Sequence, residues 1–283
     1  MSGVRLEVQW SPVHPDKCIT WGTEIFLYEV VSLKDVSKLS CSKVSDTTVA
    51  NLLAINSNHH YVKCVDIYPH PQPEPDILLA IGQANGKVVL TTFGPTVFDA
   101  LGLAGKELVP RHARQCNTVA WNPVDSNLIA AGLDKYRADH SVLLWDVLKC
   151  PHHGDRRTSV APSVSHQHPA ASPPVELARP VAELGLSETA HSLAWFNCQS
   201  RSLVIGMNNK HLKLVDLRDS NKAVMSTPTK AVYGLVVDPH NDHQLASFVE
   251  NHIYVWDTRN FEKPVLTLAQ SKPVTKVLWC PTR

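Results

Sequence analysis

Residues 235–257 read LVVDPHNDHQLASFVENHIYVWD, and this stretch decides the fold. An apolar segment ends at Asp238-Pro239, a second runs from Leu245 to Phe248, and a third ends in Trp256-Asp257. Short runs rich in Val, Ile, Phe and Tyr between Pro, Asn and Asp turns are typical of β-strands. The stretch therefore predicts three consecutive strands of one sheet.

The first segment of this pattern recurs along the chain. Val237 lies 42 residues after Trp195 and 42 residues before Trp279, and one WD-type propeller blade takes about 40–45 residues. The intervals between the earlier anchor residues are longer, so those repeats must contain insertions. We predict an all-β WD-repeat propeller with five repeats and the first strand of a sixth, truncated from a seven-bladed ring. The anchor residues of the repeat are Trp10, Ile67, Trp121, Trp195, Val237 and Trp279.

The third strand of a repeat ends in Trp-Asp or in a related pair. A tryptophan there can bury its apolar face between neighbouring blades, and the aspartate can accept backbone N–H groups of the following turn. One repeat has valine in place of the tryptophan, and Ile25–Glu29 fills this slot in the first repeat. We assign these structural roles to Trp145, Asp146, Asp216, Trp256 and Asp257.

Three insertions interrupt the repeat. Residues 149–180 are rich in Pro, Ser, Ala and His and lack hydrophobic periodicity, so we expect a disordered loop between blades. Residues 32–60 form a second, polar insertion, and residues 93–114 form a third that lengthens an outer strand or a loop. The chain stops just after a sixth repeat has begun, which we interpret as a fragment or short isoform of a longer protein.

Composition excludes several classes of protein. There are 27 basic and 26 acidic residues, so no strong field attracts nucleic acid or an anionic membrane. The first residues lack a secretory signal, and no stretch has the roughly 20 apolar residues of a membrane helix. The seven cysteines are scattered and never form a C-x-x-C pair, which favours reduced cytosolic thiols over a disulfide framework or zinc site.

No motif predicts catalysis. Histidines 152, 153, 166 and 168 lie in the predicted loop, where we expect solvated side chains and no metal site. The segment GLAGKE at residues 102–107 lacks the first glycine and the Ser/Thr of a phosphate-binding loop. We therefore predict no enzyme activity and no cofactor. The residues of a possible interaction surface form a modest basic patch: Arg111, His112, Arg114, Lys135 and Arg137.

Four segments are more specific than the general repeat. They read IGQANGKVVLT (81–91), KELVPRHARQCNT (106–118), AAGLDK (130–135) and FEKPVLTL (261–268). With them the chain resembles the N-terminal propeller of the Mio (missing oocyte, meiosis regulator) family. Members of this family continue into a helical solenoid and a zinc module, and we expect neither within this sequence.

The resemblance implies a WD-repeat subunit of the second GATOR subcomplex, located in the cytoplasm and recruited to the lysosomal surface. That subcomplex activates target-of-rapamycin signalling by opposing a Rag GTPase-activating complex. Implied partners are Seh-one-like and Sec-thirteen-like propellers, other WD subunits and cytosolic amino-acid sensors. Two alternatives stay open: a substrate receptor of a ubiquitin ligase, and a scaffold propeller of the coat or nuclear-pore type.

Overall fold

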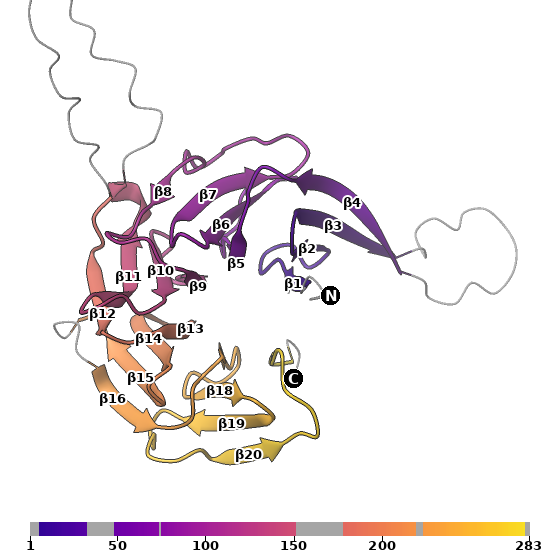
Figure 1. Cartoon of the computed structure of the whole chain (residues 1–283). Helices are drawn as coiled ribbons and strands as arrows, with labels where there is room; N and C mark the ends of the chain where they lie inside the picture. Colours follow the sequence, from indigo (N-terminus) through magenta and orange to yellow (C-terminus); the bar gives the residue numbers. More distant parts are fainter. Residues whose placement is uncertain (1–5, 33–47, 74, 151–177, 219–222, 281–283) are drawn as a thin grey trace, which may run out of the picture.

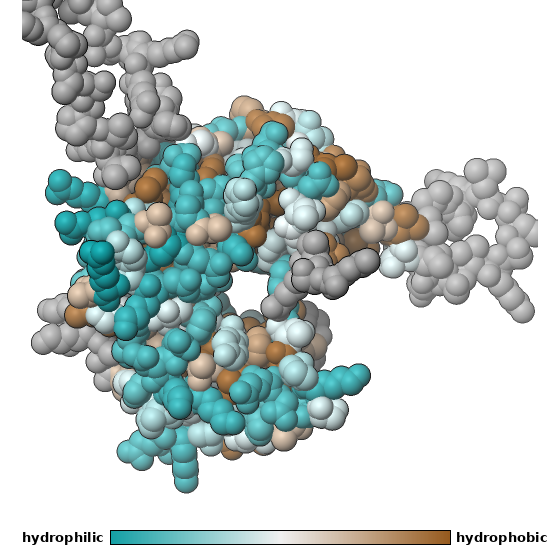
Figure 2. Space-filling view, in the orientation of Figure 1, coloured by the Kyte–Doolittle hydropathy of each residue, from teal (hydrophilic) through white to brown (hydrophobic). Residues whose placement is uncertain are grey.

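The chain folds into five four-stranded sheets arranged around a hollow centre (Figures 1 and 2). The computed structural model describes residues 6–32, 48–73, 75–150, 178–218 and 223–280. Within each sheet the strands follow one another in chain order and pair antiparallel, as in the blades of a propeller. The predicted all-β propeller with five repeats is confirmed. The ring is open between the first and the fifth blade (Figure 1).

In each blade the first strand lies nearest the ring centre and the fourth strand lies outermost. Blade 1 comprises β1 (Glu7–Trp10), β2 (Lys17–Trp21), β3 (Ile25–Ser32) and β4 (Thr48–Asn56). Blade 2 comprises β5 (Val62–Ile67), β6 (Ile77–Gln83), β7 (Val88–Phe93) and β8 (Glu107–Leu108). Blade 3 comprises β9 (Cys116–Trp121), β10 (Leu128–Leu133), β11 (His140–Asp146) and β12 (Ala182–Leu186), with the 3-10 turn η2 (Val147–Lys149) after β11. Blade 4 comprises β13 (Ala190–Phe196), β14 (Gln199–Met207), β15 (His211–Asp216) and β16 (Ala223–Pro228). Blade 5 comprises β17 (Gly234–Val237), β18 (Gln244–Val249), β19 (His252–Asp257) and β20 (Leu266–Ala269).

The strand register places the anchor residues of blades 1 to 5 in equivalent positions. In blade 3, Trp121 of β9 pairs with Ile129 of β10, which pairs with Trp145 of β11. Each of the other blades has the same row at the same place. These rows are Trp10–Cys18–Tyr28, Ile67–Leu79–Thr91, Trp195–Leu203–Val215 and Val237–Leu245–Trp256.

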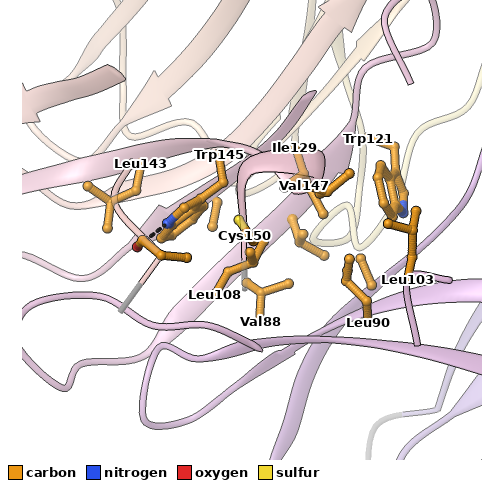
Figure 3. Packing of buried hydrophobic residues seen from close by; sticks show 14 of the residues in the cluster. Val88, Leu90, Leu103, Leu108, Trp121, Ile129, Leu143, Trp145, Val147 and Cys150 are labelled. Atoms are coloured by element: carbon orange, nitrogen blue, oxygen red, sulfur yellow. Dashed lines mark hydrogen bonds between the residues drawn. The ribbon is translucent and has the colours of Figure 1, made fainter. Parts of the chain in front are cut away.

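Four apolar clusters fill the four interfaces between neighbouring blades. In the cluster between blades 2 and 3, Trp145 has no exposed surface and its indole Nε1 donates to Ala178 O at 3.3 Å (Figure 3). Trp256 is buried in the same way between blades 4 and 5. Most of the core therefore lies between the sheets, and each blade depends on its neighbours to cover its faces.

The inner strands are also joined through one carboxylate. Asp66 of β5 accepts hydrogen bonds from Gln9 Nε2 of β1 at 2.8 Å and from Trp121 N of β9 at 2.7 Å. Its own blade adds the N–H of Ile67. Burial raises the pKa of Asp66 to about 6, although these hydrogen bonds favour the ionised form. One side chain thus links the first three blades around the hollow centre.

The predicted first strand of a sixth blade is wrong as a strand. Residues 277–279 have no paired neighbour among the described residues, and a lone strand has no ladder to join. Trp279 nevertheless keeps its anchor contact: its Nε1 donates to Val236 O at 3.3 Å, as Trp195 Nε1 donates to Ala120 O at 3.1 Å. Each acceptor directly precedes the anchor of the preceding blade.

The three predicted insertions contain strands or buried residues that were not expected. Residues 32–60 contain β4, the outer strand of blade 1, which the polar composition concealed. Residues 93–114 supply the short outer strand β8 of blade 2. Cys150 and Ala178, at the two ends of the predicted loop 149–180, are buried in the cluster between blades 2 and 3. Residues 151–177 lie outside the described part of the chain.

Two sheet faces border the opening of the ring. Trp10 is 51% exposed, whereas the equivalent Trp195 is 4% exposed, because no blade precedes blade 1 in the described chain to cover its anchor row. Apolar surface over the outer strands of blade 1 is visible in Figure 2. The exposed apolar residues on these two blades include Val8, Leu52, Ile55, Leu266 and Leu268.

Candidate interaction surface

The aspartates that end the third strands hold the turns that follow. Asp146, Asp216 and Asp257 each accept the backbone N–H of the residue two positions later, at 3.1, 2.9 and 2.9 Å. Arg218 and Arg259 add side-chain bonds to the last two carboxylates. The hydrogen bond from Arg259 lowers the pKa of Asp257 to about 2. These aspartates organise the blade turns.

The predicted basic patch is built by two loops around Tyr136. Arg111 and His112 lie in the loop between β8 and β9, and Lys135 and Arg137 lie in the hairpin between β10 and β11. The His112 ring stacks on the Tyr136 ring at 4.6 Å between centroids. The Arg137 guanidinium lies 5.5 Å from the same centroid. We call these five residues the Tyr136 surface.

The hairpin that carries Tyr136 has a tight, strained turn. Asp139 N donates to Tyr136 O at 2.9 Å, and Arg137 in between adopts a φ of +46°. A side chain other than glycine rarely takes this conformation, and such residues persist where the surroundings fix them. The turn therefore holds Arg137 against the aromatic ring.

Arg114 belongs beneath this surface and not on it. Its side chain is buried, with 4% exposure, and its guanidinium binds Asp139 at 2.6 Å and also the carbonyl of His140. Although partial burial opposes ionisation, hydrogen bonds from His112 and Arg114 lower the pKa of Asp139 to about 2. Arg114 and Asp139 thus join the two loops. The prediction that Arg114 is part of the exposed patch is wrong, since its side chain is buried two residues before the covered strand β9.

The remaining members of the patch are reached by solvent. Arg111, Lys135 and Arg137 are exposed, and Lys135 N donates at 2.9 Å to Oγ1 of Thr189, which lies in the connection between β12 and β13. Tyr136 and Asp139 were missed when the basic patch was predicted from the sequence. Their signal was present in the segment from Asp134 to His140, where an aromatic residue and acidic residues interrupt the basic ones.

A second exposed feature is the apolar loop that follows β7. Val97 and Phe98 are 67% and 64% exposed, and Val97 has a φ of +53°. The buried Asp76 holds this loop by accepting the backbone N–H groups of Thr96 at 3.0 Å and Phe98 at 2.7 Å. The hydrogen bonds from Thr96 and Phe98 lower the pKa of Asp76 against the opposing effect of its burial. Sequence reasoning missed this loop.

Among the residues with assigned positions, no group of three or more His, Cys, Asp or Glu side chains is placed to hold a metal ion. Lys106, from the segment compared with a phosphate loop, is buried and donates to Val147 O at 2.7 Å. His152, His153, His166 and His168 lie outside the described residues. No helix in the described ranges is long and apolar enough to span a bilayer.

Comparison with known proteins identifies the family. The family model described as "MIOS, WD40 repeat" matches residues 41–283. The GATOR2 complex protein MIOS-A of Xenopus laevis is 45% identical over 295 residues, and the GATOR2 complex protein MIOS of Danio rerio is 43% identical over 285 residues. Each alignment covers 100% of this chain and 32% of the relative, so the chain spans about a third of these proteins.

A more distant relative has a different name. The SEH-associated protein 4 of Saccharomyces cerevisiae is 21% identical over 250 residues, which cover 81% of this chain and 21% of the yeast protein. The family model covers the second to fifth blades entirely, together with the outer strand of the first. Because the family model matches most of the chain and the vertebrate proteins are similar over all of it, the chain belongs to the MIOS WD40 repeat family.

Proposed function

We propose that this chain is a non-catalytic scaffold subunit of a GATOR2-type complex and that the Tyr136 surface binds another subunit. The family relationship and the names of the vertebrate relatives support membership of such a complex. The observation that carries the choice of surface is the stacking of His112 and Arg137 on Tyr136, held from below by Arg114 and Asp139.

The chemistry of this surface suits a protein partner. Tyrosine and arginine are enriched in protein interfaces and among the residues that dominate binding energy. Tyr136 and Arg137 are already ordered by their contacts, so binding costs less conformational entropy than it would with free side chains. Arg111 and Lys135 add positive charge at the rim, where it favours association with an acidic partner surface.

The wider role of the complex follows from the family resemblance. We propose that the chain acts in the cytoplasm and at the lysosomal surface, in a complex that opposes a Rag GTPase-activating complex and so activates target-of-rapamycin signalling. Seh-one-like and Sec-thirteen-like propellers, other WD subunits and amino-acid sensors are the proposed partners. The name of the yeast relative supports the Seh-type partner.

Affinity purification with quantitative mass spectrometry tests both parts. The tagged chain should recover the WD-repeat subunits of the complex, and the double variant Tyr136→Ala, Arg137→Glu should reduce their recovery about tenfold, as loss of a strong interface residue does. Arg218→Glu is the matched control, because Arg218 is an exposed arginine beside an aspartate on blade 4. Equal recovery by both variants would reject the Tyr136 surface.

The alternative functions predict other partners. Recovery of cullin adaptors, or of coat or nuclear-pore components alone, would overturn membership of the complex. For the signalling role, cells without the endogenous protein are supplied with this chain, starved of amino acids and refed. We expect phosphorylation of target-of-rapamycin substrates to depend on the chain, and an unchanged response would contradict this role.

A further inference from the structure

Two cysteines from neighbouring blades meet beside the hollow centre of the ring. Cys64 lies on β5 of blade 2 and Cys116 lies on β9 of blade 3. Their Sγ atoms are 3.7 Å apart, and both thiols are free. Cys116 is fully buried, whereas Cys64 is half-buried. The distance is that of a weak thiol–thiol contact, longer than the roughly 2.0 Å of an S–S bond.

A third strand leaves room for the two sulfur atoms. Gly82 of β6 pairs with Cys64. A Cβ atom added at Gly82 would overlap Cys64 Sγ and would lie 2.7 Å from Cys116 Sγ, closer than atoms approach without bonding. The thiols therefore occupy the space of the missing side chain. Any larger residue at this position would push them out of contact.

We propose that Cys64 and Cys116 are a modification site at which oxidation forms a disulfide between blades 2 and 3. The oxidant is a peroxide. The Cys64 thiolate attacks one peroxide oxygen, the O–O bond breaks, and Cys64 becomes a sulfenic acid while the other oxygen leaves as water after taking a proton. The Cys116 thiolate then attacks the Cys64 sulfur, the S–O bond breaks, and the departing hydroxide leaves as a second water after taking the proton that Cys116 released. The two thiols are oxidised by loss of two hydrogens, and the peroxide is reduced to two waters.

The surroundings make this oxidation slow at neutral pH. The hydrogen bond with Cys116, burial, and the negative charge of Asp66 together hold the pKa of the Cys64 thiol well above its usual value. Because the thiolate is the nucleophile, little of the reactive form is present near pH 7. Cys116 and Asp66 are the ionisable groups that raise this pKa. The reaction accelerates as the pH increases, because a larger fraction of Cys64 is then the thiolate.

The cross-link would join two blades that share the Tyr136 surface. Residues 109–115, which carry His112 and Arg114, run directly into Cys116. Joining residues 64 and 116 closes a long loop of chain, and such cross-links restrict the unfolded state most. Oxidation therefore adds a covalent bond between β5 and β9, and no other cysteine takes part.

The test is peptide mapping of the full chain after treatment with dilute hydrogen peroxide and trapping of free thiols. We expect a non-reduced peptide pair containing Cys64 and Cys116, lost on reduction, forming faster at pH 9 than at pH 7. The melting temperature should increase by about 5 °C. Cys64→Ala should abolish the peptide pair. Cys150→Ala is the matched control, since Cys150 is a buried thiol whose Sγ donates to Asp146 O.

Several results would overturn the proposal. Cys64 oxidised to a sulfinic acid without the cross-linked peptide would show that the sulfurs cannot meet. Cross-linking of either residue to another cysteine, or a lower melting temperature in the cross-linked protein, would do so as well. The mapping uses the unmodified chain, so its outcome does not depend on whether the alanine variants fold.

Discussion

Trp195 and Trp10 occupy the same register position in different surroundings, so the pair isolates the contribution of a neighbouring blade. Trp195 is 4% exposed between blades 3 and 4, and its indole binds Ala120 O. Trp10 ends the inner strand of blade 1 and is 51% exposed at the opening of the ring. We predict that Trp195→Ala is much more destabilising than Trp10→Ala.

The magnitudes follow from the buried area. A tryptophan buries about 150–250 Å², and large-to-small substitutions of buried aromatic residues cost about 3–5 kcal/mol because a cavity remains. Trp195→Ala should reach this range. Trp10 keeps about half of its surface in water, so the lost transfer free energy is about half and solvent fills the space; we expect about 1–2 kcal/mol.

Urea unfolding followed by far-UV circular dichroism measures both values, since this signal does not depend on the tryptophan removed. The two variants should share the m-value of the unsubstituted chain, which shows that only stability has changed. If Trp10→Ala were as destabilising as Trp195→Ala, blade 1 would have a covered anchor row in solution. Such a result would refute an uncovered face on blade 1.

Three further predictions concern buried groups. Trp145→Ala should lower the free energy of unfolding by about 3–5 kcal/mol, and a tolerant response in urea unfolding would contradict its place between blades 2 and 3. The pKa of Asp66 is about 6 in the folded chain against 3.8 for an unperturbed aspartate, so its contribution to stability is fully present below pH 3.8 and is lost as the pH increases through 6. The melting temperature of the unsubstituted chain minus that of Asp66→Asn should therefore decrease as the pH is raised from 3.8 to 6. A difference that does not change with pH would refute the raised pKa of Asp66. Asp139→Asn leaves the Arg114 guanidinium buried without its carboxylate and should cost about 3 kcal/mol. Because the pKa of Asp139 is lowered to about 2, this difference should be present above pH 4 and should disappear as the pH falls through 2; a cost unchanged at pH 2 would argue against the ion pair.

The repeat was predictable because each blade contains the same local pattern. The spacing of Trp195, Val237 and Trp279 indicated the blade length, and the short apolar runs between turn residues indicated the strands. β4 was missed because Thr48–Asn56 alternates weakly and stands in a polar region. Its identity as an outer strand depends on pairing with β3, which is a contact between residues distant in sequence.

The interaction surface was predictable only in part. Clustered arginine and histidine residues indicated a basic patch, and they do lie in adjacent loops. Which of them is exposed depends on tertiary packing: Arg114 points beneath the loop to Asp139, and Arg137 lies over Tyr136. Likewise, nothing in the spacing of Cys64 and Cys116 indicated their contact, because it arises from the side-by-side packing of two blades.

The open arrangement of blades has a consequence for local unfolding. In an array whose units are stabilised by nearest-neighbour contacts, an end unit has one interface and an interior unit has two. Blades 1 and 5 should therefore open first, and backbone amides in β10 and β11 of blade 3 should exchange with deuterium most slowly. The hairpin bearing Tyr136 joins these two strands, so it stands on the part of the molecule that opens last.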